Sequence, residues 1–472
     1  MKKYLGSWRQ AAWLLIIVLL WGSTPAAGGL FDSLTIDREK QIGEEFFLEI
    51  QNYYTISSDP FVSSYINRLG RKLVAQLGPQ PYTYRFFIMD DPTPNAMAVP
   101  GGYIFVTTGF IRTMEREGEL AGVLAHEVSH VYARHLARQM DKSRGVNIAT
   151  MVGSLAAILI GGPAAAAILA GTQAAGISAM LKYSRDHEQE ADSLGFKWLA
   201  KAGYHPREMM SVFRKLSKQR WFQGGETPIY LSTHPHTDDR LVDLAHQMGT
   251  YKGKLPEKTD SPEYHYFAIK VESNCGNPHL LLRRMTQASI REPKNPVYQY
   301  GKALALNKLD RSDEAMDALK QALQLDPDNF IVQREMAVQY FEQNRYQQAL
   351  PILLRLKQRY AQDEAVLYYL GRIYQEQHQT DQALAAMERV QSLNPAFVEV
   401  YHSLGTLYGE KGRLGLAHYY LGLHSLRARA YPTALFHFKK AQANMPVSDS
   451  HYRELRNQID RLEKLKVKLS RD

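Results

Sequence analysis

Cysteine is nearly absent from this chain of 472 residues, and Cys275 is its only example. A single thiol cannot form an intramolecular disulfide, so a small disulfide-stapled scaffold is excluded. The chain also lacks any block of Lys or Arg, although its net charge is +9. Scattered basic residues without a base-reading module argue against a nucleic-acid partner. Hydrophobic residues at 45% and charged residues at 22% are globular values, and the length predicts two or three domains.

Acidic residues are missing from residues 1–27, where Lys2, Lys3 and Arg9 precede an apolar run from Ala11 to Trp21. This run is too short for a comfortable transmembrane helix, and the small residues after it predict a signal peptide cleaved near residues 26–28. No Cys follows the run, which excludes a lipoprotein signal. Removing the three cations from the net charge of +9 leaves about +6. We therefore expect an exported protein, with an uncleaved anchor as the alternative.

A metal-binding pattern occurs at His126-Glu127-Val128-Ser129-His130, whose flanks consist largely of Leu, Ala and Val without Pro and predict a buried helix. Residues four apart lie on one face of a helix, so both imidazoles can bind one Zn²⁺. Glu127 lies beside the first ligand and could take the proton of a metal-bound water. The same pattern occurs by chance on solvated helices with two surface histidines, but the apolar flanks favour the metal site.

A catalytic zinc needs a third protein ligand and one open position. His135 lies nine residues after His126, on the opposite face of a continuous helix, so we expect it behind the ligands or on the surface. Glu188 and Asp192 lie four residues apart and could supply one ligand carboxylate and a second carboxylate that orients an imidazole. Glu190 is expected to point elsewhere, although spacing alone does not separate Glu188 from Glu190.

The stretch Ser184-Arg-x-x-Glu-x-x-Ala-Asp192 resembles the second motif of a zinc peptidase family that includes the CAAX prenyl endopeptidases and the heat-shock protease of the bacterial inner membrane. Residues 94–109 resemble the family's strand ahead of the zinc helix. Leu231-Ser-Thr-His-Pro235, followed by Arg240, adds a further match. The resemblance covers about residues 35–250.

In that family the ligand is the Glu three residues before Ala-Asp, which corresponds to Glu188, and the Asp corresponds to Asp192. The resemblance therefore implies one Zn²⁺ per chain, held by His126, His130 and Glu188. It assigns catalytic roles to Glu127 and Asp192.

A sixth candidate is His234, in the stretch Thr233-His-Pro235. Gly224 and Gly225 precede it and suggest a mobile loop. A histidine beside an open zinc site can donate a hydrogen bond to an oxyanion. It could instead occupy the fourth metal position until substrate displaces it, and the sequence does not rank these two roles.

The resemblance and the residue patterns together predict a mainly α metallopeptidase domain with a small β-sheet, of the α+β zincin-like class. Residues 36–77 predict two amphipathic helices separated at residues 57–60, and residues 84–89 and 102–107 have strand patterns. If the strand at 102–107 lies at the sheet edge, a peptide substrate could pair with it. An ordinary buried strand is the alternative.

Residues 145–181 contain no charged residue and are rich in Ala and Gly, with Gly161-Gly-Pro163 near the middle. Each half is too short to span a bilayer comfortably, and the centre breaks a helix. We expect a helical hairpin beside the cleft that contacts substrate or a membrane surface. A buried pair of core helices is the alternative.

A repeat with a period of 34 residues fills the C-terminal part. Small residues recur at that spacing in two series, and an apolar or aromatic series shares the period: Ala303, Ala337, Gly371 and Gly405; Ala315, Ala349, Ala383 and Ala417; Leu306, Tyr340, Tyr374 and Tyr408. This is the tetratricopeptide pattern, which predicts an all-α solenoid with a concave surface that binds peptides or proteins. A partial fifth unit has Ala434 only 17 residues after Ala417.

We therefore expect a signal peptide at 1–27, a zinc metallopeptidase domain at 28–250, a linker at 251–290 and a repeat domain at 291–472. Two function classes compete: a zinc endopeptidase whose repeats recruit protein substrates or assembly machinery, and a non-catalytic chaperone or adaptor. Intact His126, Glu127, His130 and Glu188 favour the enzyme. The resemblance implies a periplasmic location, unfolded or misassembled protein substrates, and quality control in outer-membrane protein assembly.

Overall fold

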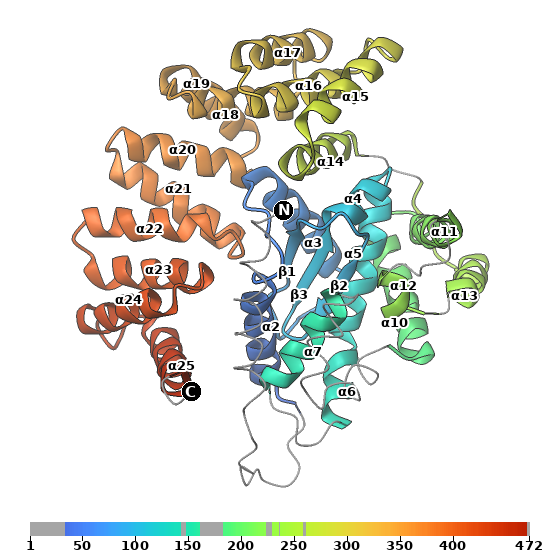
Figure 1. Ribbon diagram of the computed structural model, residues 1–472, viewed down its shortest axis with the longest axis horizontal. Coiled ribbons are helices and arrows are strands. Elements are labelled where there is room, and N and C mark those ends of the chain that lie inside the picture. The colour runs from blue at the N-terminus through green and yellow to red at the C-terminus, as the bar shows by residue number, and fades with distance from the viewer. Residues whose placement is uncertain are drawn as a thin grey trace, which may run out of the picture.

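The computed structural model describes residues 34–142, 148–160, 183–222, 229–235, 237–257 and 261–469, so the expected signal peptide lies outside the described residues. A small domain with three strands is followed by an arc of helices that curves around it (Figure 1). The elements of the first domain are α2 (Ile36–Ile50), α3 (Pro60–Val74), β1 (Arg85–Met89), β2 (Ala96–Val99), β3 (Tyr103–Thr107), α4 (Thr108–Thr113), α5 (Glu117–Tyr132), α6 (His135–Lys142), α7 (Ile148–Ile160), α10 (Arg185–Lys201), α11 (Arg207–Phe222), α12 (Ile229–Thr233) and α13 (Thr237–Thr250). The fold class expected from the sequence is confirmed.

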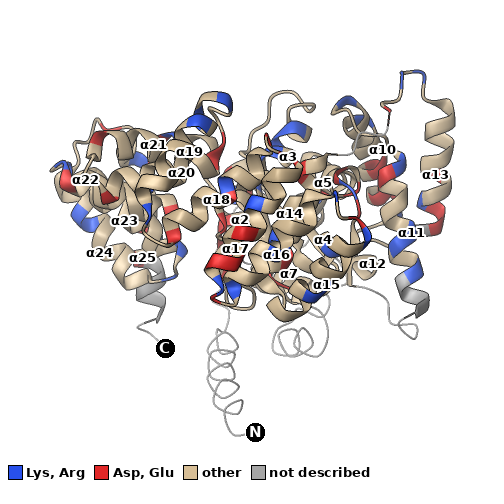
Figure 2. Ribbon diagram, turned by 90° about the horizontal axis from the view of Figure 1, so that it is seen from above, with Lys and Arg blue, Asp and Glu red and all other residues tan. Residues whose placement is uncertain are grey.

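The arc contains paired helices. Its elements are α14 (Pro262–Cys275), α15 (Pro278–Arg291), α16 (Pro296–Lys308), α17 (Ser312–Leu325), α18 (Phe330–Glu342), α19 (Tyr346–Arg359), α20 (Glu364–Glu376), α21 (Thr380–Leu393), α22 (Glu399–Glu410), α23 (Leu414–Arg427), α24 (Tyr431–Asn444) and α25 (Tyr452–Leu469). Basic and acidic residues are interspersed on the ribbons of both domains (Figure 2).

The sheet has the strand order β1-β3-β2, with β1 parallel and β2 antiparallel to β3. Gly101 and Gly102 have φ values of 85° and 89°, which favour glycine and allow the tight turn from β2 into β3. The strand at 102–107 is therefore central, and the hypothesis that it forms the substrate-facing edge is wrong. The edge strand that packs against α5 is β2.

The other edge of the sheet, β1, is closed by side-chain and loop contacts. The Asn67 amide donates to the Phe86 carbonyl oxygen at 2.9 Å, and its Oδ1 accepts from the Phe86 amide at 3.1 Å. The Ser57 amide donates to the Ile88 carbonyl at 2.9 Å. Because these backbone groups are already paired, β1 has little capacity to pair with another strand.

Alternate residues of the strands fill two cores on opposite faces of the sheet. On one face Phe46 and Phe47 of α2 pack against Phe87 and Phe105, with ring centroids 5.3 Å apart for Phe46–Phe105 and 4.6 Å for Phe47–Phe87. On the other face the core contains Ile104 together with apolar residues of α3 and α5. The two helices expected within residues 36–77 are α2 and α3, and Asp59 caps α3 ahead of Pro60.

The first half of the uncharged stretch forms α7, which packs against α2. Its buried residues include Met151, Val152, Leu155, Ala156 and Leu159, which belong to the same core as Phe46. The described part of this stretch therefore matches the alternative of buried core helices rather than a hairpin beside the cleft. The physical reason is that α7 covers an apolar face of α2. The second half, residues 161–182, lies outside the described residues. Among the helices described, none combines the length and apolar character that crossing a membrane requires.

Four helix pairs repeat with the period seen in the sequence: α16–α17, α18–α19, α20–α21 and α22–α23. The turn inside each pair has one left-handed residue, at Asp310, Asn344, His378 and Gly412, again 34 residues apart. A Cβ atom at Gly405 would lie 2.6 Å from Leu421 Cγ, so the small residue lets the paired helices approach closely. The partial fifth unit is the additional helix pair α24–α25.

Residues 251–290 do not form a linker throughout, because α14 and most of α15 lie within them. Pro262 and Pro278 occupy the first helical turns, where proline is tolerated, and do not interrupt a helix there. The Tyr264 hydroxyl on α14 donates to the carbonyl oxygens of Ile111 and Met114, at 3.3 and 3.2 Å. This segment therefore packs against the first domain.

The arc contacts the first domain again farther along the chain. Arg71 of α3 forms an ion pair with Glu364 at 2.6 Å and donates to the Leu393 carbonyl at 2.6 Å. Arg461 of α25 pairs with Glu44 of α2 at 2.9 Å. The inner side of the arc therefore faces the protein's own first domain, as Figure 1 shows. Less of this surface is available to a partner than the repeat pattern alone suggests.

Candidate metal centre

Helix α5 places His126, Glu127 and His130 in the interior of the first domain. Glu117 and Glu119 lie in its first turn, where negative charge stabilises a helix N-terminus. The apolar flanks bury the helix on nearly all sides, and residues 118–131 are all buried. His126 and His130, one turn apart, point their Nε2 atoms to the same place, 3.0 Å from each other.

Helix α10 crosses α5 at Gly195 and brings Glu188 to the same place. A Cβ atom at Gly195 would lie 3.3 Å from the backbone nitrogen of His126 and 2.8 Å from Met209 Cε, so only a small residue permits this close crossing. Ser184 caps the start of α10. Glu188 Oε2 lies 3.5 Å from His126 Nε2, and Oε1 lies 3.5 Å from His130 Nε2.

A fourth donor comes from His234, immediately after α12. Its Nδ1 lies 3.0 Å from Glu188 Oε1 and 3.2 Å from His126 Nε2. The side chains of His126, His130, Glu188 and His234 are buried, and one donor atom from each lies within 4.8 Å of all the others. The sequence grouped the first three, and the structure adds His234 at the same point.

Asp192 lies behind His126, one turn after Glu188 on α10. Its Oδ1 accepts from His126 Nδ1 at 2.9 Å, which leaves the His126 Nε2 lone pair for the cluster. Burial alone would raise the pKa of Asp192, but the charge and hydrogen bonds of Arg240 outweigh burial and lower that pKa. Asp192 is therefore ionised and holds the imidazole orientation.

His135 lies behind His130, although a continuous helix would place it on the opposite face. Helix α5 ends at Tyr132, and Arg134 has a φ of 54°, so the chain turns and α6 begins at His135. His135 Nδ1 lies 2.8 Å from His130 Nδ1, and its Nε2 lies 3.0 Å from Glu190 Oε2. The helix geometry assumed for His135 is wrong, while its expected place behind the ligands is correct.

Hydrogen bonds through His135 orient His130 in the same way that Asp192 orients His126. With Nε2 of His130 directed at the cluster, its Nδ1 carries a proton and donates to His135, which in turn donates to Glu190. Burial lowers the pKa of His135 to about 4, so this imidazole is neutral at pH 7. Glu190 thus points away from the cluster, as expected, but contacts it through two histidines.

Glu127 lies beside the cluster. Its Oε1 accepts from the Tyr230 hydroxyl at 3.3 Å and lies 3.6 Å from His234 Nε2. Its Oε2 is buried and accepts no hydrogen bond from any described residue. The Tyr230 ring stacks on His234, with centroids 4.5 Å apart. One carboxylate oxygen of Glu127 is therefore free to accept a proton.

The charges of the cluster fit a divalent cation. Burial alone would raise the pKa of Glu188, but His234 and Arg240 outweigh it and hold this pKa well below its ordinary value. Burial also keeps the pKa of His130 well below 6.5, so this imidazole is neutral and can act as a ligand. Neutral imidazoles and an ionised carboxylate are the donors that zinc prefers, and tetrahedral zinc places its ligand atoms about 3.3 Å apart. The separations that involve His126 or Glu188, which are 3.0–3.5 Å, agree with that geometry.

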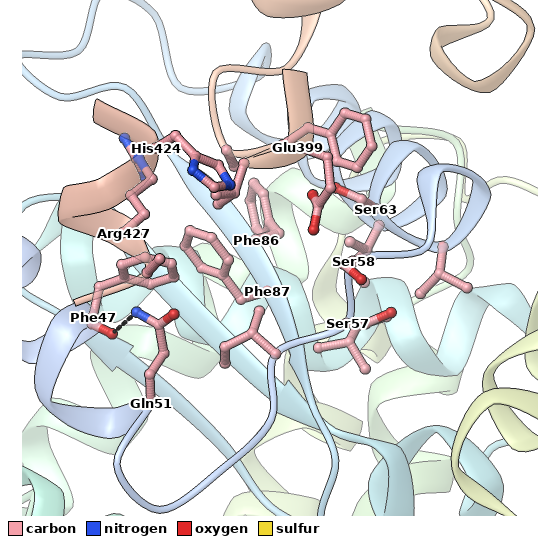
Figure 3. Close-up of a pocket in the computed structure, with 18 residues that line it drawn as sticks. Phe47, Gln51, Ser57, Ser58, Ser63, Phe86, Phe87, Glu399, His424 and Arg427 are labelled. Atoms are coloured by element: carbon pink, nitrogen blue, oxygen red, sulfur yellow. Dashed lines mark hydrogen bonds between the residues drawn. The ribbon is translucent and has the colours of Figure 1, made fainter. Parts of the chain in front are cut away.

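A cavity of about 240 Å³ lies between the two domains (Figure 3). Phe86 and Phe87 of β1 and Phe47 of α2 form its apolar wall, and Arg427 and Glu399 come from the helical arc. No lining residue belongs to the metal cluster. This cavity is therefore a separate feature from the cluster.

Sequence reasoning missed the roles of Arg240, Tyr230 and Tyr183. Arg240 was part of the resemblance but received no role, since nothing in a sequence shows that an arginine is buried against two carboxylates. Tyr183 directly precedes α10, and its ring stacks on His130 at a centroid distance of 3.8 Å. The mobile loop expected at Gly224 and Gly225 lies outside the described residues.

Comparison with known proteins identifies both parts. Residues 60–248 match the model of Peptidase family M48, and residues 306–373 and 340–408 match the tetratricopeptide repeat model. The matched peptidase segment includes the cluster, and the matched repeats lie within α16–α22. The resemblance and the repeat pattern inferred from the sequence are thereby confirmed.

Several relatives are peptidases by name. The chain is 32% identical over 301 residues to the beta-barrel assembly-enhancing protease of Yersinia pestis, covering 62% of this chain and 60% of the relative. For the Escherichia coli K12 protein of that name the identity is 31%, with the same coverage. The mitochondrial metalloendopeptidase OMA1 of Schizosaccharomyces pombe is 27% identical over 45% of this chain and 61% of its own length. The chain thus spans about three fifths of the length of these relatives.

Proposed function

We propose that the protein is a zinc-dependent endopeptidase, because residues 60–248 match the model of Peptidase family M48. The observation that carries this proposal is the convergence of four buried donors beside a carboxylate with one free oxygen. His126, His130 and Glu188 would hold the zinc, with Asp192 and His135 orienting the two imidazoles. A protein used only as a binding platform has no use for the free oxygen of Glu127.

Glu127 acts as the proton carrier of the proposed reaction. When bound, zinc polarises the scissile carbonyl and makes the attacking water more acidic. As the water oxygen bonds to the carbonyl carbon, the carbonyl π electrons move to its oxygen and Glu127 takes a proton from the water. Glu127 then gives this proton to the amide nitrogen as the carbon–nitrogen bond breaks. The products are a carboxylic acid and an amine.

The edge strand β2, whose four residues are all buried in the described conformation, is the strand along which an extended substrate would lie once the site opens. Ala98 and Val99 line a small cavity that also contains His130 and Tyr183. An extended peptide can add to a free strand edge through its backbone, which recognises shape rather than one sequence. This binding mode suits unfolded or misassembled segments, because a folded protein seldom exposes an extended strand.

His234 closes the cluster in the described conformation. The exposed fractions of His126, Glu127, His130 and His234 are all 2% or less, and the cavity beside β2 has a volume of only about 10 Å³. A space of that size holds about one water molecule and no peptide. We therefore assign His234 to the fourth ligand position in the resting state, from which substrate displaces it. The burial and direction of its Nδ1 support this gating role.

The names of the relatives and the presence of the repeats support a proposal for the biological setting. Two relatives are named for enhancing beta-barrel assembly, and tetratricopeptide repeats bind proteins. We extend this to a protease that removes misassembled proteins during outer-membrane assembly in the periplasm. Partners would bind the outer side of the helical arc, because the inner side faces the peptidase domain.

Zinc content and proteolysis, measured side by side, test the function. The wild-type protein and Glu127→Gln are analysed for metal and incubated with an unfolded protein such as casein. We expect about one zinc per chain in both and cleavage only by the wild type, since Gln cannot accept the proton. Equal cleavage by both would show that Glu127 is not the base and would overturn the proposed mechanism.

A further inference from the structure

Tyr183 has a hydroxyl group that the structure leaves without a hydrogen-bond partner among the described residues. Only 7% of the residue is exposed, and its oxygen is fully buried. Native proteins seldom bury a polar group without a partner, because water is lost and nothing replaces it. A group that binds there only during function is one physical reason for such an exception.

The position of Tyr183 suggests what that group is. Its ring stacks on His130 with an interplanar angle of 27°, and its centroid lies 5.0 Å from that of His234. It lines the small cavity next to β2 together with Ala98 and Val99. Once the site has opened and His234 is displaced, a peptide that lies along β2 would pass between that strand and Tyr183, beside the proposed metal ligands.

Two other side chains beside the cluster that could act as donors, those of Tyr230 and His234, are engaged in the described conformation. The Tyr230 hydroxyl donates to Glu127 Oε1 at 3.3 Å. His234 directs its Nδ1 at Glu188 and His126, and its Nε2 faces Glu127 at 3.6 Å. Of these three side chains, only Tyr183 has a donor without a partner in the described part of the chain.

We propose that the Tyr183 hydroxyl donates a hydrogen bond to the carbonyl oxygen of the scissile peptide as this oxygen gains negative charge. The inference rests on the proposed peptidase function and makes Tyr183 a catalytic residue of the same reaction. Tyr183 keeps its own proton throughout, while the proton of water travels through Glu127 to the amide nitrogen. A preorganised donor in a dry site stabilises the developing charge more than the neutral ground state.

The test compares Tyr183→Phe with the wild type, and Tyr132→Phe serves as the matched control. Tyr132 lies at the end of α5 near His130, but it is 42% exposed and packs on Trp198. Zinc content, kcat and KM are measured with a quenched fluorescent peptide. Binding of a phosphinic peptide, which mimics the tetrahedral state, is compared with binding of the uncleaved peptide in a Glu127→Gln background.

For Tyr183→Phe we expect unchanged zinc content, a kcat lower by about 10²-fold and a KM near the wild-type value, as for loss of one oxyanion donor. Affinity for the phosphinic peptide should fall by a similar factor, while affinity for the uncleaved peptide stays constant. Tyr132→Phe should change none of these quantities.

Three results would overturn the proposal. A wild-type kcat in Tyr183→Phe at equal zinc content removes the catalytic role. Equal losses for both peptides would make Tyr183 a wall of the substrate groove, and loss of zinc would make it a support for His130. If the wild type cleaves no peptide, the proposed function fails first, and the two binding measurements still decide whether Tyr183 distinguishes the tetrahedral ligand.

Discussion

Arg240 binds Asp192 through two nitrogens, with Nε 2.6 Å from Oδ2 and Nη2 2.8 Å from Oδ1. Its Nη1 also lies 2.6 Å from Glu188 Oε2, so one guanidinium pairs with both carboxylates that α10 directs at the histidines. Burial alone would lower the pKa of Arg240, but Asp192 and Glu188 outweigh it and raise that pKa. A single residue of α13 therefore makes the charge of the metal centre tolerable in the interior.

Replacing Arg240 should reveal how strongly the two buried carboxylates destabilise the fold when they have no counter-ion. Arg240→Met is expected to lower the free energy of unfolding of the metal-free protein by about 3–5 kcal/mol, because two buried carboxylates lose their counter-ion. Arg185→Gln is the control, since its pair with Asp239 is 58% exposed on both sides and should contribute 0–1 kcal/mol. Urea unfolding measures both. Similar effects of the two substitutions would contradict the role given to Arg240.

Glu188 and Glu190 should differ sharply in zinc affinity. Glu188→Gln removes a proposed ligand and should reduce affinity severely. Glu190→Gln changes only the outermost residue of the hydrogen-bond series that runs from Glu190 through His135 to His130. The metal content of this variant should therefore stay near that of the wild type. Competition with a zinc-binding dye measures the two constants. The reverse order would show that the ligand assignment is wrong.

His234→Ala distinguishes gating from oxyanion stabilisation. Since Nδ1 of His234 points into the ligand cluster, we expect the variant to keep its zinc and to cleave an unfolded protein faster than the wild type. An oxyanion donor would instead give a turnover lower by about 10²-fold. Rates at equal zinc content decide by their sign, and an unchanged rate would exclude both roles.

Lys270 should be essential for the joint between the domains. Its Nζ lies 2.9 Å from both carboxylate oxygens of Glu335 and 3.7 Å from Asp59, the cap of α3. Lys270→Met leaves the buried carboxylate of Glu335 without a cation and should destabilise the protein by about 3–5 kcal/mol. Lys320→Met removes an exposed pair with Asp317 and should have almost no effect. Thermal unfolding of both variants is the measurement.

Glu119 should contribute stability that acid removes. Burial alone would raise its pKa, but hydrogen bonds from Lys215, Ser211 and the Glu115 amide outweigh burial and lower it. The contribution is complete above the unfolded pKa, about 4.3, and is lost as pH falls through the lower folded pKa. Glu119→Gln should therefore be less stable at pH 7, and its unfolding free energy should decline less steeply below about pH 4.3. Parallel curves for wild type and variant would show that the carboxylate charge is not responsible.

The sequence by itself determined which helices carry the metal ligands and how the repeats are built. His126 and His130 share a face in any α-helix, and so do Glu188 and Asp192, because local hydrogen bonding sets that period. The repeat period likewise follows from small residues wherever two adjacent helices touch. These predictions needed only contacts that are close in sequence, and the fold confirmed the helices and the repeats.

Only the tertiary structure decided how these helices meet. His135 contacts His130 because the chain turns at Arg134, which has a left-handed backbone conformation. An arginine in a sequence does not predict such a conformation. The edge strand became β2, since strand order depends on pairing between distant segments. Arg240 and Tyr183 gained their places from the crossing of α5, α10 and α13, and the repeats curved back onto α2 and α3. Side-chain burial and charge pairing across such separations are properties of the packed chain, and no local pattern in the sequence specifies them.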